Sequence, residues 1–474
     1  MKICIYIENN LIFSIIMCGI TGIISSDNNI ISDFYESLLN IQHRGQDACG
    51  YVINNIIYKK NGLVKNAISY NDISKLNSNI AIGHTRYPTT YSKNENENQP
   101  FQVKLQNNNI SLVHNGNIYN YDIYLKELEK YNINLNSNSD SEFLLYYIYY
   151  LIIYKYNYLN FDNAIISSIK YIIDNIKGAY SVILLIENYG LVCFRDKFGI
   201  RPLMYGKKNN TYMISSENIA HNILEYNYQK DIENIAIFKN NGIVEEYNYN
   251  FKLKPCLFEY IYLARPESRI NDVSVYDFRI NMGYYLAKNI INNLTVNELN
   301  NIDAIIPIPD TSIISATSLA EKLNKPIKFG IIKNRYIDRT FIMNNNITRN
   351  KNIKRKFLFI NSELNNKNII LIDDSIVRGN TSKHIISQLK LAGVKKIYFV
   401  SCAPPIKYVN KYGIDLPLQT DLIAHNNNDM EISKLLNIDN IIFQSVDDLK
   451  KCFTDINNNV NDFELSVFDN VYIN

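Results

Sequence analysis

The stretch from residue 369 to residue 382 constrains the fold of this chain more than any other segment. It contains an apolar run, the two carboxylates Asp373 and Asp374, a short loop with Gly379, and the polar start of a helix at Thr381. A short apolar run bounded by turn residues is typical of a buried strand. A plain strand-to-helix turn with an Asp or Ser cap explains part of this pattern. Backbone N–H groups at such a helix start also form a cradle for phosphate.

The rest of the second half repeats this order of strand and helix. The sequence predicts strands at 303–307, 367–372 and 395–400, and helices at 315–323 and 381–391. Regular alternation of strands and helices indicates a parallel sheet that is covered by helices. We therefore predict an α/β domain with a parallel sheet in this half.

The first half lacks this regular order. Apolar residues recur with helical spacing at 30–41 and 140–154, whereas 180–186, 191–195 and 212–215 read as strands. A chain of 474 residues is long enough for two to three domains. We place a boundary near residue 250, which gives domains at 18–250 and 251–474.

The composition excludes several classes of function. The net charge is +3, which gives no broad electrostatic case for binding nucleic acid or a membrane surface. No apolar run is long enough to span a bilayer. The 7 cysteines are scattered without a CxxC pair, and the 6 histidines lack zinc-ligand spacing. These features favour a reducing compartment, so we expect a cytoplasmic protein.

Cys18 follows Met17 and opens an apolar run that is punctuated by glycine. If Cys18 becomes the first residue of the chain, its thiol is a nucleophile and its own α-amine is the base. The alternative is a buried structural cysteine in a first strand. We interpret residues 1–17 as a propeptide, or as an extension upstream of a true start at Met17.

Four further segments place polar residues beside glycine or at expected strand ends. They are HRGQDA at 43–48, GHTRY at 83–87, HNGN at 114–117 and SDSE at 139–142. Each alone has a structural alternative, because Asn-Gly is usually a turn and Ser-Asp before an apolar run is usually a helix N-cap. Together with Cys18, their order and content resemble the glutamine amidotransferase domain of the N-terminal nucleophile class, which is an α+β fold with αββα layers.

This resemblance implies roles for six residues: Cys18 as the nucleophile, Asn115 and the backbone N–H of Gly116 as the oxyanion hole, and Arg44, Arg86 and Asp140 as glutamine-binding residues. Within the last group, Arg86 would pair with the α-carboxylate of glutamine and Asp140 with its α-ammonium, while Arg44 would support the nucleophile. The chemistry is consistent with these roles. A side-chain amide is unreactive, and a thioester intermediate splits its hydrolysis into two easier steps.

The stretch at 369–382 resembles the signature of type I phosphoribosyltransferases. The segment at 306–312 resembles their pyrophosphate loop, and the basic segment at 333–356 resembles a lid over the pyrophosphate. The implied binding residues for the ribosyl pyrophosphate are Asp310, Thr311, Ser312, Lys333, Arg335, Lys356, Asp373, Asp374, Arg378, Gly379, Asn380, Thr381 and Ser382. Of these, Thr311, Asp373 and Asp374 would also help to hold Mg²⁺. Asn380 stands where close relatives carry Thr, but Thr381 and Ser382 remain, so we expect binding to be retained.

Both constellations in one chain resemble the amidophosphoribosyltransferase family. The resemblance implies that glutamine and 5-phosphoribosyl 1-pyrophosphate are the substrates, and that 5-phosphoribosylamine, pyrophosphate and glutamate are the products. This is the first committed step of purine synthesis. The resemblance also implies a requirement for Mg²⁺, a homodimer or homotetramer, and feedback inhibition by AMP and GMP.

Two alternatives and one further expectation accompany this reading. A different amidotransferase of the same class is disfavoured by the stretch at 369–382 and by the lack of an SGGxDS-type ATP loop. A non-enzymatic sensor of ribosyl pyrophosphate would not need the proposed glutamine residues. Some relatives bind a four-iron cluster through four cysteines. Cys256 and Cys452 match two of these positions, but Asn410 and Leu449 stand near the other two, so we predict no iron–sulfur cluster.

Overall fold

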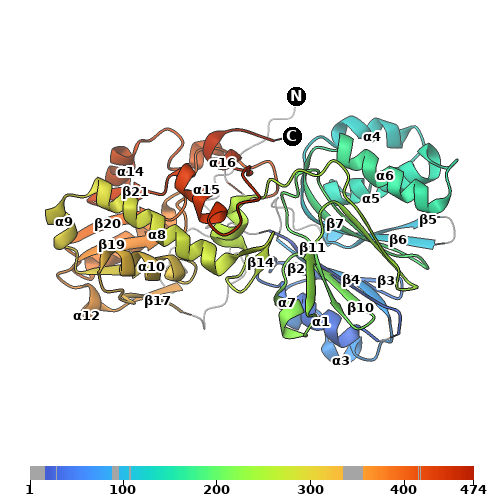
Figure 1. Cartoon of the computed structure of the whole chain (residues 1–474), viewed down its shortest axis with the longest axis horizontal. Coiled ribbons are helices and arrows are strands. Elements are labelled where there is room, and N and C mark those ends of the chain that lie inside the picture. Colours follow the sequence, from blue (N-terminus) through green and yellow to red (C-terminus); the bar gives the residue numbers. More distant parts are fainter. Residues whose placement is uncertain are drawn as a thin grey trace.

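The computed structural model describes residues 17–27, 29–87, 95–105, 108–334, 356–414, 416 and 418–473. Arg335 and most of the segment predicted to be a lid lie outside the described residues, as do residues 1–16. The chain has two parts that lie side by side. Figure 1 shows one part built on antiparallel strands and the other built on a parallel sheet.

The first part contains two antiparallel sheets. One has seven strands in the order β11-β9-β10-β1-β4-β2-β3, and the other has six in the order β13-β12-β8-β7-β6-β5. The strands of the first sheet are β1 (Gly19–Ser25), β2 (Ala48–Ile53), β3 (Ile56–Asn61), β4 (Ile80–Arg86), β9 (Met204–Lys208), β10 (Thr211–Ser215) and β11 (Tyr228–Asp231). Those of the second are β5 (Phe101–Leu105), β6 (Asn108–Ile118), β7 (Gly178–Ile186), β8 (Gly190–Arg195), β12 (Ile235–Lys239) and β13 (Val244–Tyr247).

Helices cover the outer faces of these two sheets. Helix α1 (Ile31–Asn40) buries Phe34 and Leu38 against the seven-stranded sheet. On the other side, α5 (Asp140–Tyr150) and α6 (Phe161–Asn175) bury their apolar side chains against the six-stranded sheet. A third cluster lies between the sheets. The predicted αββα layering is therefore confirmed (Figure 1).

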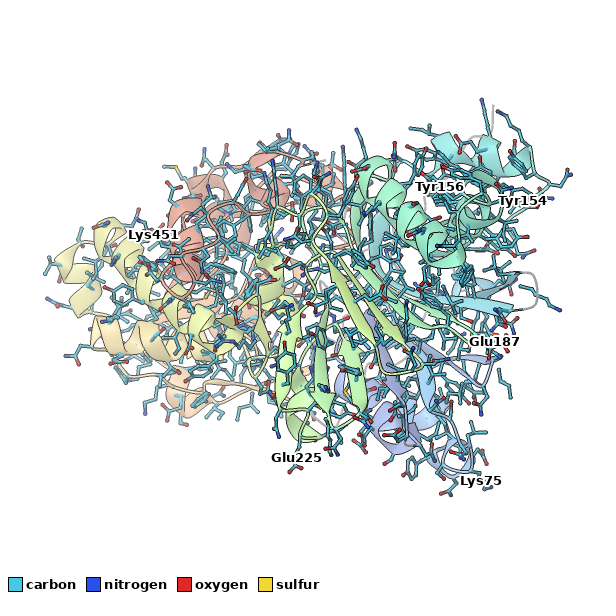
Figure 2. The ribbon with its side chains drawn as sticks, turned by 45° about the vertical axis from the view of Figure 1, so that its right-hand side comes forward. Lys75, Tyr154, Tyr156, Glu187, Glu225 and Lys451 are labelled. Atoms are coloured by element: carbon cyan, nitrogen blue, oxygen red, sulfur yellow. The ribbon has the colours of Figure 1, made fainter. Side chains whose placement is uncertain are left out.

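The predicted helix at 140–154 ends its regular part earlier than expected. It forms α5 to Tyr150 and then continues as the π-helix η2 (Leu151–Lys155). Tyr154 and Tyr156 lie at this outer end of the helical layer, far from Lys451 of the second part, and side chains fill the region between the two parts (Figure 2).

The second part is built on four parallel strands in the order β16-β19-β20-β21. They are β16 (Ala304–Pro307), β19 (Asn368–Asp373), β20 (Lys396–Ser401) and β21 (Asn440–Phe443). Successive residues of β19 point to opposite faces, as in any strand. Ile370 and Ile372 pack in one cluster, and Ile369 and Leu371 pack in another. The sheet is therefore buried on both faces, which explains the continuous apolar run in the sequence.

Helices supply those two clusters. On one face lie α8 (Val275–Asn293), α10 (Ile313–Leu323) and α15 (Val446–Thr454). On the other face lie α13 (Asn380–Leu391) and α14 (Asp429–Leu436). The predicted parallel α/β arrangement is confirmed, and each predicted strand and helix of this half agrees with the structure to within about two residues.

The segment that joins the two parts contains little regular secondary structure. It contains the π-helix η3 (Glu259–Leu263) and a small hairpin of β14 (Arg269–Ile270) and β15 (Val273–Ser274). The last strand of the antiparallel sheets ends at Tyr247. The boundary near residue 250 remains a prediction. Residues after it still contact the first part: Glu259, for example, pairs with Arg44 and Arg201.

Candidate active sites

Cys18 lies immediately before β1 and is half-buried. Gly19 pairs with Thr85 of β4, so Cys18 is placed beside the end of that neighbouring strand. The Sγ of Cys18 donates a weak hydrogen bond to the carbonyl oxygen of Tyr87, at 3.6 Å. The thiol therefore sits at a strand end where Arg86 and Tyr87 emerge, and not inside the apolar core.

The electrostatic surroundings of this thiol bring together residues that are far apart in the sequence. Burial raises the pKa of Cys18 above its ordinary value. The hydrogen bond to Tyr87 and the positive charges of Arg86 and Arg44 act in the opposite direction, while the charge of Asp140 raises the pKa further. The three predicted glutamine-binding residues are thus close enough to Cys18 for their charges to act on it.

Asn115 and Gly116 lie within the extended strand β6, where they pair with Ser181 and Tyr180 of β7. The alternative that this Asn-Gly pair forms a turn is therefore wrong. The Asn115 side chain is fully buried. Among the described residues, neither its Oδ1 nor its Nδ2 has a hydrogen-bond partner. A buried amide without a partner is costly, so its place in this site indicates a donor kept available for a ligand.

Arg86 and Asp140 are both held in place by other polar groups. The Arg86 guanidinium donates to Glu97 at 3.0 Å and to Asn98 at 2.5 Å. The Oδ2 of Asp140 accepts from the backbone N–H of Ile118 at 3.0 Å. Asp140 opens α5, and the residue before it, Ser139, caps that helix as the N-cap alternative expected. Ser139 therefore caps the helix while the next carboxylate is directed toward β6. The N-cap reading is confirmed, and the glutamine-binding role of Asp140 stays a prediction.

Arg44 is buried and contacts the backbone of Cys18. Its Nε donates to the carbonyl oxygen of Cys18 at 3.1 Å. Its two terminal nitrogens pair with Glu217 at 2.6 Å and with Glu259 at 3.0 Å. His43 also contacts Glu217, at 2.7 Å, and although burial opposes it, the His43 and Arg44 charges hold the pKa of Glu217 well below its ordinary value.

The sequence did not assign a role to Glu217 or to Glu259. Glu259 stands in the FEY string that follows the domain boundary, but nothing in that string indicates a partner more than 200 positions earlier in the chain. Glu217 carries no motif at all. Only the fold reveals that both carboxylates neutralise the buried Arg44.

Asp373 ends β19 and Asp374 follows it, so both carboxylates stand at the carboxyl end of a central parallel strand. Ligands of open α/β sheets bind at this edge. Burial and the charge of Asp374 raise the pKa of Asp373. Burial also raises the pKa of Asp374 to about 6, against hydrogen bonds from Ser375 and Thr311 and the charge of Arg279. Two adjacent carboxylates that resist ionisation together form a site where positive charge is stabilising.

The loop after these carboxylates leads into α13. Gly379 is the N-cap of this helix, with φ of 74°, a left-handed conformation that glycine adopts without strain. Asn380 and Thr381 start the helix and Ser382 is buried. Arg378 pairs with Asp421 at 3.2 Å. The predicted strand, loop and helix are therefore present, and the N–H groups of the first turn of α13 have no partner within the helix itself.

The predicted pyrophosphate loop lies beside the same edge of the sheet. Asp310 pairs with Lys333 at 2.8 Å, and the hydroxyl of Ser312 donates to the carbonyl oxygen of Ile308 at 2.5 Å. Thr311 contacts Asp374, and the charge of Lys356 acts on Asp373. The structure thus brings together the described members of the predicted set, while Arg335 lies outside the described residues.

The positions considered for an iron–sulfur cluster have other partners. Leu449 is buried in the apolar core, and the Oδ1 of Asn410 accepts hydrogen bonds from the backbone N–H groups of Tyr412 and Ile414. Cys256 and Cys452 are buried free thiols. In the described part of the chain, no group of three or more His, Cys, Asp or Glu side chains is arranged to hold a metal ion.

Comparison with known proteins identifies the family. A family model for a glutamine amidotransferase domain matches residues 84–221, and one for a phosphoribosyl transferase domain matches residues 285–432. An amidophosphoribosyltransferase of Pasteurella multocida is 40% identical over 471 residues, which covers 96% of this chain and 93% of the relative. The chain belongs to the amidophosphoribosyltransferase family. The amidophosphoribosyltransferase of Saccharomyces cerevisiae is 36% identical over 477 residues and covers 96% of this chain and 92% of its own length.

A solved structure agrees with this family. The glutamine phosphoribosylpyrophosphate amidotransferase of B. subtilis, complexed with ADP and GMP, superposes with a TM-score of 0.83 at 30% identity. The match covers 96% of this chain and 97% of the other. The chain is therefore an enzyme of the pentosyltransferase class with a glutamine amidotransferase activity, and it catalyses the first committed step of purine synthesis.

The same findings dispose of the alternatives raised by the sequence. The relatives named amidophosphoribosyltransferase match 96% of the chain, so it is neither another amidotransferase of the N-terminal nucleophile class nor a non-enzymatic sensor. Among the described residues, no helix is both long enough and apolar enough to cross a membrane.

Proposed function

We propose that the chain carries out its reaction at two separate sites, with Cys18 in the first part and the Asp373–Asp374 pair in the second. The observation that carries this proposal is the separation of the two chemistries. A thiol influenced by Arg86, Arg44 and Asp140 stands in one part, and a half-buried pair of carboxylates stands at a parallel sheet edge in the other (Figure 1).

In the first site, glutamine lies with its α-carboxylate on Arg86 and its α-ammonium on Asp140. The thiolate of Cys18 attacks the side-chain carbonyl carbon, and the α-amine of the same residue takes up the thiol proton. Asn115 and the N–H of Gly116 stabilise the negative charge that develops on the oxygen. Ammonia leaves as the thioester forms, and water then cleaves the thioester to give glutamate and the free thiol.

In the second site, the residues present fit a bound Mg²⁺. Asp373 and Asp374 supply carboxylate oxygens, which this ion prefers, and Thr311 stands beside them with its hydroxyl. The raised pKa values of the two carboxyls mean that a divalent cation between them would be stabilised by charge. When bound, Mg²⁺ supplies Lewis-acid neutralisation of the pyrophosphate.

The residues of the second site hold the donor for attack by ammonia. Arg378 and the start of α13, from Gly379 to Ser382, bind the 5′-phosphate through the N–H groups and the helix dipole. The pyrophosphate lies on the loop at 310–312, with Lys333 and Lys356 beside it. Ammonia travels inside the protein from Cys18 and forms a bond to the anomeric carbon, while the bond from that carbon to pyrophosphate breaks.

The nucleophile needs a free α-amine, so we propose that the active enzyme begins at Cys18. While Met17 is attached, the nitrogen of Cys18 is an amide and accepts no proton from the thiol. Cleavage of a propeptide produces the free amine, and so does initiation at Met17 followed by removal of methionine. Intact-mass measurement of the protein from its native source tests this: active enzyme that still carries residues 1–17 would contradict it.

We also propose purine nucleotides, AMP and GMP, as feedback inhibitors, a homodimer or homotetramer as the assembly, and the cytoplasm as the compartment. The inhibitor proposal is supported by the B. subtilis relative, which was solved with ADP and GMP. The six cysteines in the described part are free thiols, which favours a reducing compartment.

One assay tests the proposed function. Release of pyrophosphate from 5-phosphoribosyl 1-pyrophosphate is measured with glutamine or with ammonium chloride as the nitrogen source, with Mg²⁺ and with a chelator. We expect release with either nitrogen source and none with the chelator. Release that is independent of any nitrogen source would contradict the proposal.

A further inference from the structure

The loop from Asn410 to Ile414, here called the clasp loop, belongs to the second part of the chain but lies against the glutamine site of the first. Asn410 fixes the loop by accepting hydrogen bonds from the N–H groups of Tyr412 at 2.8 Å and Ile414 at 3.0 Å. Three consecutive residues of the loop, Lys411, Tyr412 and Gly413, then each meet a different residue of the first part.

Gly413 packs against the backbone of Gly116. Gly413 has φ of 99°, and a Cβ placed on it would lie 2.8 Å from the carbonyl carbon and 2.9 Å from the carbonyl oxygen of Gly116. Those atoms are backbone and give way only if β6 itself moves. One residue further along β6, the side-chain N–H of Asn117 donates to the carbonyl oxygen of Lys411 at 2.9 Å.

The contact of Tyr412 leads to the nucleophile. Its carbonyl oxygen accepts from the Nε and a terminal nitrogen of Arg201, at 3.0 and 2.8 Å. Arg201 is fully buried and pairs with Glu259 at 3.1 Å. Glu259 in turn pairs with Arg44, which donates to the carbonyl oxygen of Cys18. The clasp loop therefore contacts β6 directly. It is also linked to Cys18 by a chain of contacts through Arg201, Glu259 and Arg44.

We propose that the clasp loop is a positioning element of the glutamine site, contributed by the transferase part, and that Gly413 and Arg201 are positioning residues for glutamine hydrolysis. Neither touches glutamine. Gly413 sets the position of the Gly116 peptide, and Arg201 sets the position of Arg44 through Glu259. This inference rests on the proposed role of Gly116 in the oxyanion hole.

The test compares two glycine substitutions in the same half of the molecule. Gly413→Ala adds a methyl group against Gly116. Gly393→Ala is the matched control, because Gly393 has a similar φ of 88° and the three atoms nearest its added Cβ all belong to Asn365, which is part of neither the clasp loop nor the glutamine site. Both variants are assayed with glutamine and with ammonium chloride, and kcat and KM are determined for each nitrogen source.

We expect Gly413→Ala to lower kcat with glutamine by about tenfold or more, since loss of one oxyanion donor costs about 10²–10³ in kcat and here the donor is displaced. KM for glutamine and the rate with ammonia should match those of Gly393→Ala. An equal fall with both nitrogen sources would mean general damage, and a glutamine rate equal to that of Gly393→Ala would mean that Gly413 positions nothing. Either result overturns the inference.

Two further variants keep the test decisive. If Gly413→Ala does not fold, Asn117→Ala removes the partly exposed hydrogen bond to Lys411, and we expect the same selective loss with glutamine. Cys18→Ala distinguishes failure of the proposed glutamine site from failure of the proposed role of the clasp loop. If it retains glutamine-dependent activity, the proposed glutamine site is wrong. If it loses that activity while Gly413→Ala matches its control, only the role of the clasp loop fails.

Discussion

At the residue scale, the two sites place charge around their reactive groups in opposite ways. Cys18 has two arginines near it, and their charges favour the thiolate that the reaction needs. Asp373 and Asp374 stand side by side and are half-buried, and desolvation raises the pKa of both, with the charge of Asp374 raising that of Asp373 further. The first site thus sets positive charge beside a thiol whose pKa burial raises, and the second gathers negative charge that a cation would stabilise.

The raised pKa of Asp374 predicts that its ionisation lowers the free energy of unfolding, and that Asp374→Asn removes this cost. The pKa of Asp374 in the folded state is about 6, above its ordinary value of 3.8. The folded protein therefore binds this proton more tightly than the unfolded chain does, so the cost in stability is complete above pH 6 and fades as the pH falls from 6 toward 3.8. We expect Asp374→Asn to raise the free energy of unfolding at pH 8 by on the order of 1–3 kcal/mol.

Urea unfolding at pH 8 and at pH 4 measures this difference. The gain should be present at pH 8 and largely absent at pH 4, and the variant should have lost ribosyl transfer with either nitrogen source. A variant that is less stable than the natural protein at pH 8 would show that the Asp374 carboxylate stabilises the fold.

At the element scale, each site lies where a strand ends or where a helix begins. The run at 369–382 predicted its strand, loop and helix correctly because the signal is local: an apolar strand, a glycine and a polar helix start are consecutive in the chain. The oxyanion-hole role of Asn115 and Gly116 was assigned only by resemblance and stays a prediction. The dipeptide itself favours a turn, but the pairing of β6 with β7 overrides that preference.

Helix α5 gives the prediction at this scale, because its start carries Asp140. Glu142 in its first turn accepts from the N–H groups of Asn136 and Ser137, at 3.0 and 2.7 Å, and from the Ser137 hydroxyl at 2.6 Å. Glu142→Ala frees this loop and leaves its N–H groups without their acceptor. We expect a loss of about 1–3 kcal/mol in the free energy of unfolding.

The same variant should raise KM for glutamine several-fold, since the loop leads directly into Asp140, while the rate with ammonia should be unaffected. Steady-state assays with both nitrogen sources check this. An unchanged KM for glutamine would mean that the loop does not help to place Asp140.

At the scale of the whole molecule, the two parts are joined by buried charge. Arg44 and Arg201 from the first part share the single carboxylate of Glu259, which comes from the segment after the predicted boundary. The sequence could not reveal this network, because its members lie more than 50 positions apart and each alone resembles an ordinary charged residue. The predicted boundary near residue 250 thus separates the sheets of the two parts, but the ion pairs of Glu259 with Arg44 and Arg201 cross it.

Removing Glu259 should therefore weaken the molecule at this junction. Glu259→Ala leaves two buried guanidinium groups without their shared partner, and loss of one member of a buried ion pair costs about 3–5 kcal/mol. We expect a fall of that size in the free energy of unfolding by urea. Arg265→Ala is the control, because that side chain pairs with Glu267 in an exposed position, and its effect should stay below about 1 kcal/mol. Equal effects of the two variants would contradict the structural importance of the network.

One chain holds two chemically independent sites on this interpretation, and the Cys18→Ala variant is the sharpest test of that independence. Formation of pyrophosphate is measured with glutamine and with ammonium chloride, on protein that begins at residue 18. We predict that the variant loses glutamine-dependent activity completely and keeps the rate with ammonia, because the carboxylate pair at Asp373 and Asp374 does not need the thiol. Loss of both activities to the same extent would contradict the account.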